Sequence, residues 1–313
     1  MRFIGFYFCA HLTIPRRRPS PPLYVKRLLR YHAVKSASNA GWGYLIHQPF
    51  YPHINTTNPT RTLVALLALN EEHNIGRVIG NIQRIVPDVD VLVVNDGSDD
   101  GTEMVARRAG AIVLTMPHNV GIGAAEQAAF RFAARYGYRT MVRNDGDGQH
   151  EPADIPLLLD TLETQPVDMV IGSRFIGEGD YGTPATRRMG ILIIVGLLRL
   201  LTRQPITDPT SGFRAFNHRA ITCFSQIYPQ DYPEPETIVM AHRLGLRMME
   251  VPARFHMRQH GRSQFLNVRT VTYYMFKVLL AIVIDSLRRD TLPETVTMIP
   301  KEPPMPFKQG APE

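Results

Sequence analysis

Two aspartates stand two residues apart in the segment RNDGDGQHEP, residues 143–152. Alternate residues of an extended segment point the same way, so Asp145 and Asp147 can face one cavity. Carboxylates held this close repel each other, and a fold that keeps both charged usually supplies a cation or strong donors. Hard oxygen ligands suit Mg²⁺ or Mn²⁺, and Gln149 can add a carbonyl oxygen. Residues 145–149, the DxD loop, are therefore predicted to bind a divalent metal; the alternative is a solvated turn.

The elements that would position this loop alternate between strands and helices. We expect strands in TLVALLALN, VDVLVVND, AIVLTM, RTMVRND, DMVIGSR and MMEVPARF. We expect helices at residues 72–85, 102–109, 123–136, 156–162, 187–203 and 236–244, and a loop in TDPTSGFRAF, residues 207–216. This alternation predicts the α/β class, with a doubly wound, mostly parallel sheet and right-handed crossovers.

Polar residues follow three of the predicted strands. They are Asn70, Glu71, Asn95, Asp96, Asp145 and Asp147. Ligands of open α/β sheets bind beyond the carboxyl ends of the strands. We therefore expect these residues to meet at one rim, which favours the metal interpretation of the DxD loop over the turn.

Composition limits the class of protein. The chain has 313 residues, of which 44% are hydrophobic, enough for one large or two modest domains. Its formal net charge of +7 argues for an anionic partner, with nucleic acid, acidic lipid and nucleotide-sugar phosphates all open. Cys9 and Cys223 support neither a disulfide framework nor a cysteine zinc site, so a reducing compartment is the default.

Changes in amino-acid composition along the chain predict its domain organisation. Residues 1–58, with the run PRRRPSPP, are expected to form a flexible basic arm, and residues 59–265 the α/β domain. Residues 266–290 are expected to form an apolar or amphipathic helix on a protein or membrane surface, and the Pro-rich residues 291–313 a disordered tail. No window reaches the roughly 20 apolar residues that a membrane-spanning helix needs.

Six ordered segments carry a family resemblance. They are ALNEEHNI, VLVVNDGSDDGT, RNDGDGQHEP, VIGSR, DPTSGFRAF and EVPARFHMRQHGRS. Together they resemble the family 2 inverting glycosyltransferases of the GT-A fold, with the dolichol- or polyprenyl-phosphate mannosyltransferase type as the nearest branch. The resemblance covers about residues 61–265.

The resemblance implies a nucleotide-diphosphate sugar donor, GDP- or UDP-linked, and bound Mg²⁺ or Mn²⁺. On this basis Asn70 and Glu71 border the nucleotide, Asp96 contacts its base, and the DxD loop, with Asp145, Asp147 and Gln149, holds the cation on the donor diphosphate. Physical reasoning agrees, because a metal acting as a Lewis acid neutralises the charge that develops on the leaving diphosphate.

Basic residues near the phosphates would help this reaction. Arg174 in GSR and Arg214 in SGFR are candidates, because a planar guanidinium binds phosphate bidentately. Arg258 and Ser263 belong to a segment that closes over the donor in relatives of this family. For each arginine the alternative is a surface salt bridge.

The need for a general base depends on the acceptor. Transfer to a sugar hydroxyl needs one, whereas a phosphate acceptor is already an anionic nucleophile. Glu236 falls where family members with hydroxyl acceptors carry the base, and Asp208 in TDPTSGF is the reserve. The equally sound alternative for Glu236 is a role in the first turn of a helix after Pro235.

Other classes explain the sequence less well. The segment NVGIGAA, residues 119–125, follows the third predicted strand and ends in Ala, unlike a dinucleotide fingerprint, so a helix packed close to the sheet is the simpler account. A nucleic-acid-binding protein would need its acidic rim neutralised by metal, and we expect no nucleic acid as partner. The third interpretation is a catalytically inactive scaffold protein with the GT-A fold.

We therefore expect an inverting glycosyltransferase of polysaccharide or cell-envelope glycan synthesis. Its expected partners are a nucleotide-sugar donor, a polyprenyl-phosphate or lipid-linked glycan acceptor and the membrane surface, and a membrane-protein partner is a further candidate. The expected location is cytoplasmic, at the inner face of the membrane.

Overall fold

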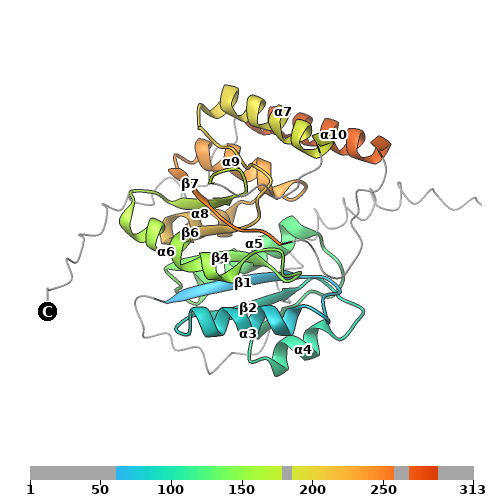
Figure 1. Ribbon diagram of the computed structural model, residues 1–313, viewed down its shortest axis with the longest axis vertical. Coiled ribbons are helices and arrows are strands. Elements are labelled where there is room, and N and C mark those ends of the chain that lie inside the picture. Colours follow the sequence, from blue (N-terminus) through green and yellow to red (C-terminus); the bar gives the residue numbers. More distant parts are fainter. Residues whose placement is uncertain (1–60, 178–184, 257–267, 288–313) are drawn as a thin grey trace, which may run out of the picture. The chain divides into compact units, whose positions relative to one another are not determined.

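Figure 1 shows a computed structural model of the protein, which describes residues 61–177, 185–256 and 268–287. These residues belong to the second of two compact units of the chain, Asn55–Glu313. The predicted basic arm, the predicted tail and the segment with Arg258 and Ser263 lie outside the described residues.

One mixed sheet organises the described residues, with seven strands in the order β3-β2-β1-β4-β6-β5-β7. The strands are β1 Thr62–Ala68, β2 Asp90–Asn95, β3 Ile112–Thr115, β4 Thr140–Asp145, β5 Met169–Ser173, β6 Arg214–Asn217 and β7 Met248–Pro252. Strands β1 to β4 pair in parallel, as do β5 and β7, whereas β6 runs antiparallel to both β4 and β5. The predicted α/β class with a mostly parallel sheet is confirmed.

The expectation of a plain loop at residues 207–216 was wrong at its end, because β6 begins at Arg214. This strand has only four residues, and Arg214, Ala215 and Phe216 are all buried, so no alternation marks it in the sequence. It is followed directly by helix α8, His218–Gln226, which was also not predicted. The side chain of Asn217 caps this helix by accepting a hydrogen bond from the backbone of Ala220.

Helices cover both faces of the sheet (Figure 1). They are α3 Ile75–Ile85, α4 Thr102–Arg108, α5 Ile122–Arg135, the 3₁₀ turn η1 Pro152–Asp154, α6 Ile155–Thr164, α7 Ala185–Thr202, α9 Pro233–Arg243 and α10 Val268–Leu287. Helix α3 begins three residues later than predicted, because the carbonyl of Glu71 first accepts the amides of Asn74 and Ile75 in a turn.

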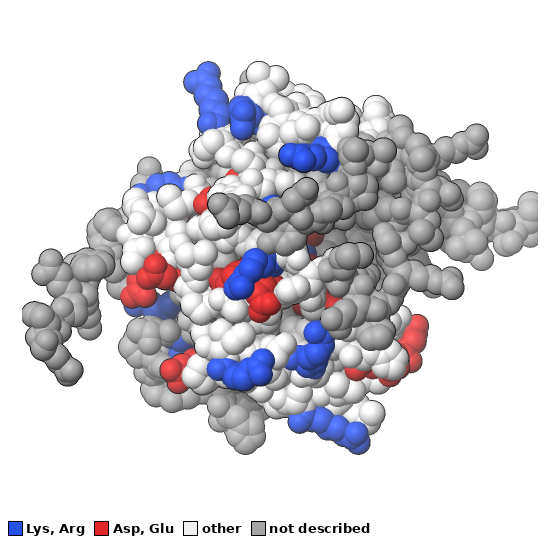
Figure 2. Space-filling view, viewed as in Figure 1, with Lys and Arg blue, Asp and Glu red and all other residues white. Residues whose placement is uncertain are grey.

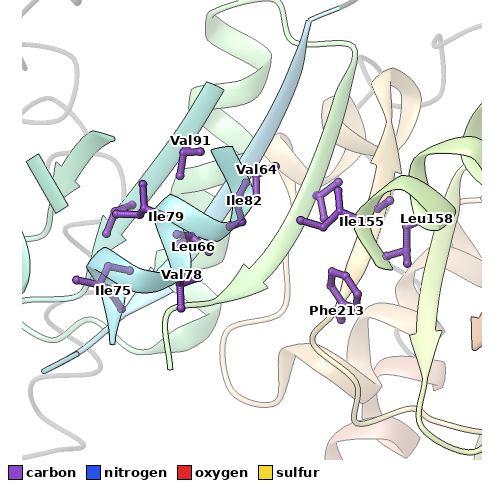
Figure 3. Close-up of a cluster of buried hydrophobic side chains, with 14 of the residues drawn as sticks. Val64, Leu66, Ile75, Val78, Ile79, Ile82, Val91, Ile155, Leu158 and Phe213 are labelled. Atoms are coloured by element: carbon purple, nitrogen blue, oxygen red, sulfur yellow. The ribbon is translucent and has the colours of Figure 1, made fainter. Parts of the chain in front are cut away.

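The packing of α3 shows why these elements form. Its buried residues recur at helical spacing, as Ile75, Val78, Ile79 and Ile82. Figure 3 shows them facing the apolar side chains of β1 and β2 within one hydrophobic cluster. Each such side chain stabilises the fold by about 1.5–3 kcal/mol relative to exposure, so Ile79→Asp would disrupt this layer.

Helices α7, α9 and α10 contact one another, and Figure 1 shows α7 and α10 beside each other at the top of the view. Arg243 of α9 donates to the carbonyl of Asp285 in α10 at 3.0 Å. Among the helices of the described residues, none combines the length and the apolar character needed to cross a membrane.

Candidate active site

The DxD loop begins where β4 ends, at Asp145. The amide of Gly146 donates to the carbonyl of Leu67 in β1 at 2.9 Å, which keeps the loop at the sheet rim. Asp147 accepts the amide of Gln149 through Oδ1 at 3.0 Å, and Gly148 adopts φ +75°, which closes the turn. The loop therefore carries both predicted metal-binding carboxylates and Gln149 on a short, hydrogen-bonded turn.

Asp145 lies between two buried side chains. Nη2 of Arg143 is 3.5 Å from its Oδ1, and Nε2 of His150 is 3.6 Å from its Oδ2. The Asp145 amide donates to His150 Nδ1 at 3.2 Å, and Oδ1 of Asn144 lies 3.0 Å from the same ring nitrogen. The ring stacks on Phe213 and meets Phe255 edge-on. Burial lowers the pKa of His150 to about 4, so the ring is neutral near pH 7.

The donor set of the DxD loop fits a hard divalent cation. Within the described residues, no three His, Cys, Asp or Glu side chains are grouped so as to hold a metal ion by themselves. Mg²⁺ and similar ions are commonly bound by one or two carboxylates, with water and substrate phosphates completing the shell. Asp145 and Asp147 supply the two carboxylates, so the residues present fit a cation that is completed by a diphosphate.

The ends of β1 and β2 lie beside this loop and are linked to each other. The amide of Asp96 donates to the carbonyl of Ala68 at 2.9 Å. Asn70, which is exposed and has φ 58°, accepts the amide of Asp99, while its own amide donates to Ser98 Oγ. The structure thus brings the three polar strand ends together at one rim.

The carboxylate of Asp96 accepts hydrogen bonds from backbone amides of the protein. It accepts the amides of Val120 and Gly121 at 2.7 and 3.1 Å, and burial raises its pKa. Glu71 is also buried, and its Oε2 accepts a hydrogen bond from Asn74. Asp96 therefore shapes the turn before α5, and its contact with a nucleotide base remains a prediction.

Arg174 and Asp208, predicted as separate candidates, form one pair. Both carboxylate oxygens of Asp208 accept from the Arg174 guanidinium, and Nη2 of Arg174 also donates to Thr210. Asp208 is fully buried, whereas 11% of the Arg174 side chain is exposed. Because part of its side chain is exposed, Arg174 remains a candidate phosphate ligand. Asp208 would have to break its ion pair with Arg174 to act as a base.

Arg214 lies inside the protein rather than on the rim. It is completely buried, and its guanidinium donates to the carbonyls of Ser211, Pro209 and Glu234. Burial lowers its pKa. Backbone carbonyls accept from Nε and Nη2, whereas the buried Nη1 has no hydrogen-bond partner among the described residues. Arg214 links the turn before β6 to the start of α9, and its contact with a phosphate remains a prediction.

Glu236 occupies the first turn of α9, as its helix interpretation predicted, and is buried. The structure adds three charged residues that the sequence reasoning missed: Glu126, Arg143 and Glu234. Glu126 of α5 lies 3.0 Å from Nη1 of Arg143, and Glu234 accepts from Nη2 at 2.9 Å. Two signals were available, namely a glutamate within the Ala-rich α5 and an arginine within the strand that precedes Asp145.

The fold and this rim define a glycosyltransferase of the GT-A class. Glucosyl-3-phosphoglycerate synthase from Mycobacterium tuberculosis, solved with Mn²⁺, uridine diphosphate and phosphoglyceric acid, matches with a TM-score of 0.56 and 20% identity, over 78% of this chain and 86% of that chain. Residues 64–224 match the family described as glycosyl transferase family 2. The chain belongs to this family.

Two curated relatives are similar over most of their own length. Polyprenol monophosphomannose synthase of Mycolicibacterium smegmatis is 31% identical over 234 residues, covering 71% of this chain and 88% of that protein. Undecaprenyl-phosphate mannosyltransferase of Micrococcus luteus is 33% identical over 215 residues, covering 65% and 87%. The predicted resemblance to the polyprenyl-phosphate branch of the family is confirmed.

Proposed function

We propose that this protein transfers a sugar from a nucleotide-diphosphate sugar to a polyprenyl phosphate, with inversion at the anomeric carbon. The observation that carries the proposal is the pair Asp145 and Asp147 on a short turn at the sheet rim, beside the ends of β1 and β2. The names of the two polyprenyl-phosphate relatives support the acceptor class.

The chain's residues have distinct tasks in this reaction. Asp145 and Asp147 would hold Mg²⁺ or Mn²⁺, which supplies Lewis-acid neutralisation of the leaving diphosphate. Arg174, fixed by Asp208 but partly exposed, is placed to bind a phosphate oxygen. A phosphate acceptor is already anionic and attacks the anomeric carbon as the carbon–oxygen bond to the diphosphate breaks, so Glu236 is not required as a base.

An exposed apolar surface supports a lipid acceptor. Several large apolar side chains of α7 and α10 point to solvent, and we call them the lipid face: Met189, Leu192, Ile193, Leu200, Phe276, Leu280, Val283, Ile284 and Leu287. Arg188, Arg199 and Arg203 are exposed on or beside α7. At the top of the view, where Figure 1 places α7 and α10, Figure 2 shows mostly uncharged surface with separate basic side chains. Apolar side chains combined with basic ones suit an anionic membrane surface.

The first test of the proposal is nucleotide binding. Thermal shifts would be measured with GDP, UDP, dTDP and CDP, each with and without Mn²⁺, on the wild type, on Asp147→Asn and on the control Asp160→Asn, which changes an exposed residue of α6. A ligand that binds the folded state raises the melting temperature. We expect one nucleotide to stabilise the wild type and the control only with Mn²⁺, and Asp147→Asn to lose the effect.

Transfer itself is tested by incubating the matching radiolabelled nucleotide sugar with polyprenyl phosphate and extracting the lipid product. Glu236→Gln separates the two acceptor classes, because removal of a general base costs about 10²–10⁴-fold in rate. A rate within a few-fold of the wild type is expected for a phosphate acceptor. Absence of labelled lipid with every nucleotide sugar, together with no nucleotide binding, would overturn the proposed function.

A further inference from the structure

We propose that Arg143 is a positioning residue that fixes the carboxylates of Asp145 and Glu234 relative to each other, with Glu126 as its buried counter-charge. The proposal rests on the proposed function, because Asp145 is taken as a cation ligand. It adds Glu234 to the site as a second acidic group held by the same guanidinium.

Arg143 occupies an unusual place for a charge. It lies in β4 with 1% of its side chain exposed, and its antiparallel neighbour across the strand pair is Arg214, which is also fully buried. Two like charges on paired strands repel each other. Replacing a buried ion pair by apolar side chains is often neutral or stabilising, so stability alone does not explain an arginine here. Its position beside Asp145 indicates a role in the site.

The contacts of Arg143 divide between its two terminal nitrogens. Nη1 lies 3.0 Å from Glu126, whose side chain is as deeply buried as its own. Nη2 donates to Glu234 Oε1 at 2.9 Å and lies 3.5 Å from Asp145 Oδ1. Because a guanidinium is planar and rigid, a single nitrogen shared by two carboxylates sets the distance between them.

The guanidinium has no room to swing away. A Cβ atom placed on Gly212 would lie 2.9 Å from Nη2 of Arg143 and 3.0 Å from its Cζ, so the turn before β6 packs directly on the guanidinium. Burial lowers the pKa of Arg143, but the carboxylates of Glu126, Glu234 and Asp145 outweigh it and raise this pKa, so the guanidinium stays charged. Burial raises the pKa of Glu126, and the charge of Arg143 opposes that rise. The positive charge of Arg143 is therefore held in a fixed position next to Asp145 of the DxD loop.

The two glutamates differ in their access to the site. The side chain of Glu126 is 1% exposed, whereas that of Glu234 is 18% exposed at the start of α9. The carbonyl of Glu234 also accepts from Nη2 of Arg214 at 2.7 Å, so the two arginines hold both its main chain and its side chain. Glu126 thus balances the charge, and Glu234 reaches the edge of the site.

The test compares Mn²⁺ affinity in folded variants. Loss of the free Mn²⁺ signal in electron paramagnetic resonance gives the Kd, with Mn²⁺ alone and with GDP or UDP. The variants are Arg143→Lys, which keeps the charge but not the fork, and Glu234→Gln, which releases Arg143 to pair fully with Asp145. Changes of groups that orient metal ligands cost about 10–100-fold in metal affinity, and we expect at least a 10-fold rise in Kd for both.

Arg219→Met is the matched control. Arg219 forms a 3.0 Å ion pair with Asp168, which precedes β5 and so lies at the opposite end of the sheet from the DxD loop. This variant should lower the melting temperature and leave the Mn²⁺ Kd unchanged. A purely structural role for Arg143 predicts the same behaviour for Arg143→Lys.

The outcomes separate this inference from the proposed function. If Asp147→Asn loses Mn²⁺ binding while Arg143→Lys and Glu234→Gln stay within twofold of the wild type, the inference is wrong and the cation site stands. If the wild type itself binds no Mn²⁺, alone or with GDP or UDP, the Mn²⁺ site falls and this inference falls with it, whereas the proposed function is still decided by nucleotide binding and labelled lipid. Loss of binding in Glu234→Gln alone supports the inference even where Arg143→Lys does not fold.

Discussion

The guanidinium of Arg174 binds both oxygens of the Asp208 carboxylate, with Nε–Oδ2 and Nη2–Oδ1 distances of 2.7 Å each. The backbone amide of Arg174 also donates to Oδ2, and Glu250 accepts the amide of Asp208. This pair joins the end of β5 to the turn before β6, two segments that lie apart in the sequence. Its geometry makes it a structural anchor at the site.

Removal of one partner of this pair should be costly. Asp208→Leu leaves a largely buried guanidinium without its counter-charge, and we expect a loss of about 3–5 kcal/mol in the free energy of unfolding. The double variant Arg174→Met with Asp208→Leu should lose less, because neither charge remains. Urea unfolding of both single variants and of the double variant measures the coupling energy between Arg174 and Asp208. If the losses in the free energy of unfolding are additive, the two residues do not stabilise the fold as a pair.

His150 should make stability depend on pH. Burial lowers its pKa from the ordinary value of 6.5 to about 4, so between these values the unfolded chain binds more protons than the folded one. The free energy of unfolding therefore falls as the pH drops through this window, by up to about 3 kcal/mol, and is unaffected above it.

The variant His150→Phe can keep the ring contacts with Phe213 and Phe255 and removes the titrating group. We expect it to be less stable than the wild type near pH 7, because the Asp145 amide loses its acceptor, at a cost of about 1–3 kcal/mol. The difference should shrink as the pH falls. Urea unfolding in metal-free buffer at several pH values tests this; a constant difference would refute the assignment.

Gly123 at the start of α5 should tolerate no side chain. A Cβ atom there would lie 2.5 Å from the carbonyl oxygen of Gln230 and would also meet that of Pro229. Helix α5 therefore packs closely against this loop, in addition to its expected packing on the sheet, where it contacts β1 and β2. We expect Gly123→Ala to cost about 1–3 kcal/mol.

Gly80 of α3 provides the control for this substitution, because a Cβ atom there meets nothing within 4 Å. Gly80→Ala should be neutral or stabilising by up to about 1 kcal/mol through helix propensity. Thermal unfolding of both variants gives the comparison. Equal effects of the two changes would show that the close contact at Gly123 is not a constraint.

The lipid face should control membrane binding. Leu192→Glu with Ile193→Glu places two carboxylates on exposed positions of α7, so we expect the fold to be kept and co-sedimentation with phosphatidylglycerol vesicles to fall several-fold. Leu157→Glu, an exposed position on α6, is the matched control. Equal sedimentation of both proteins would exclude this face as the contact.

The α/β class and the position of the DxD loop can be predicted from the amino-acid sequence. Strand β1 is a continuous apolar run because both of its faces are buried, and the chain becomes exposed and polar at Asn70, so the end of this strand is visible in the sequence. The helix predicted at residues 72–85 likewise contains the whole of α3 and begins three residues too early. These signals are local and need no knowledge of the partner.

Tertiary structure decided what the charged side chains do. Arg174 and Asp208 are separate candidates in the sequence and one ion pair in the fold. Arg214, a candidate phosphate ligand in the sequence, is buried because β6 lies between β4 and β5. Glu126 and Glu234 flank Arg143 only after α5 and α9 pack on the sheet. Ion pairing depends on distances of a few ångströms between residues far apart in the chain, and periodicity and propensity carry no information about those distances.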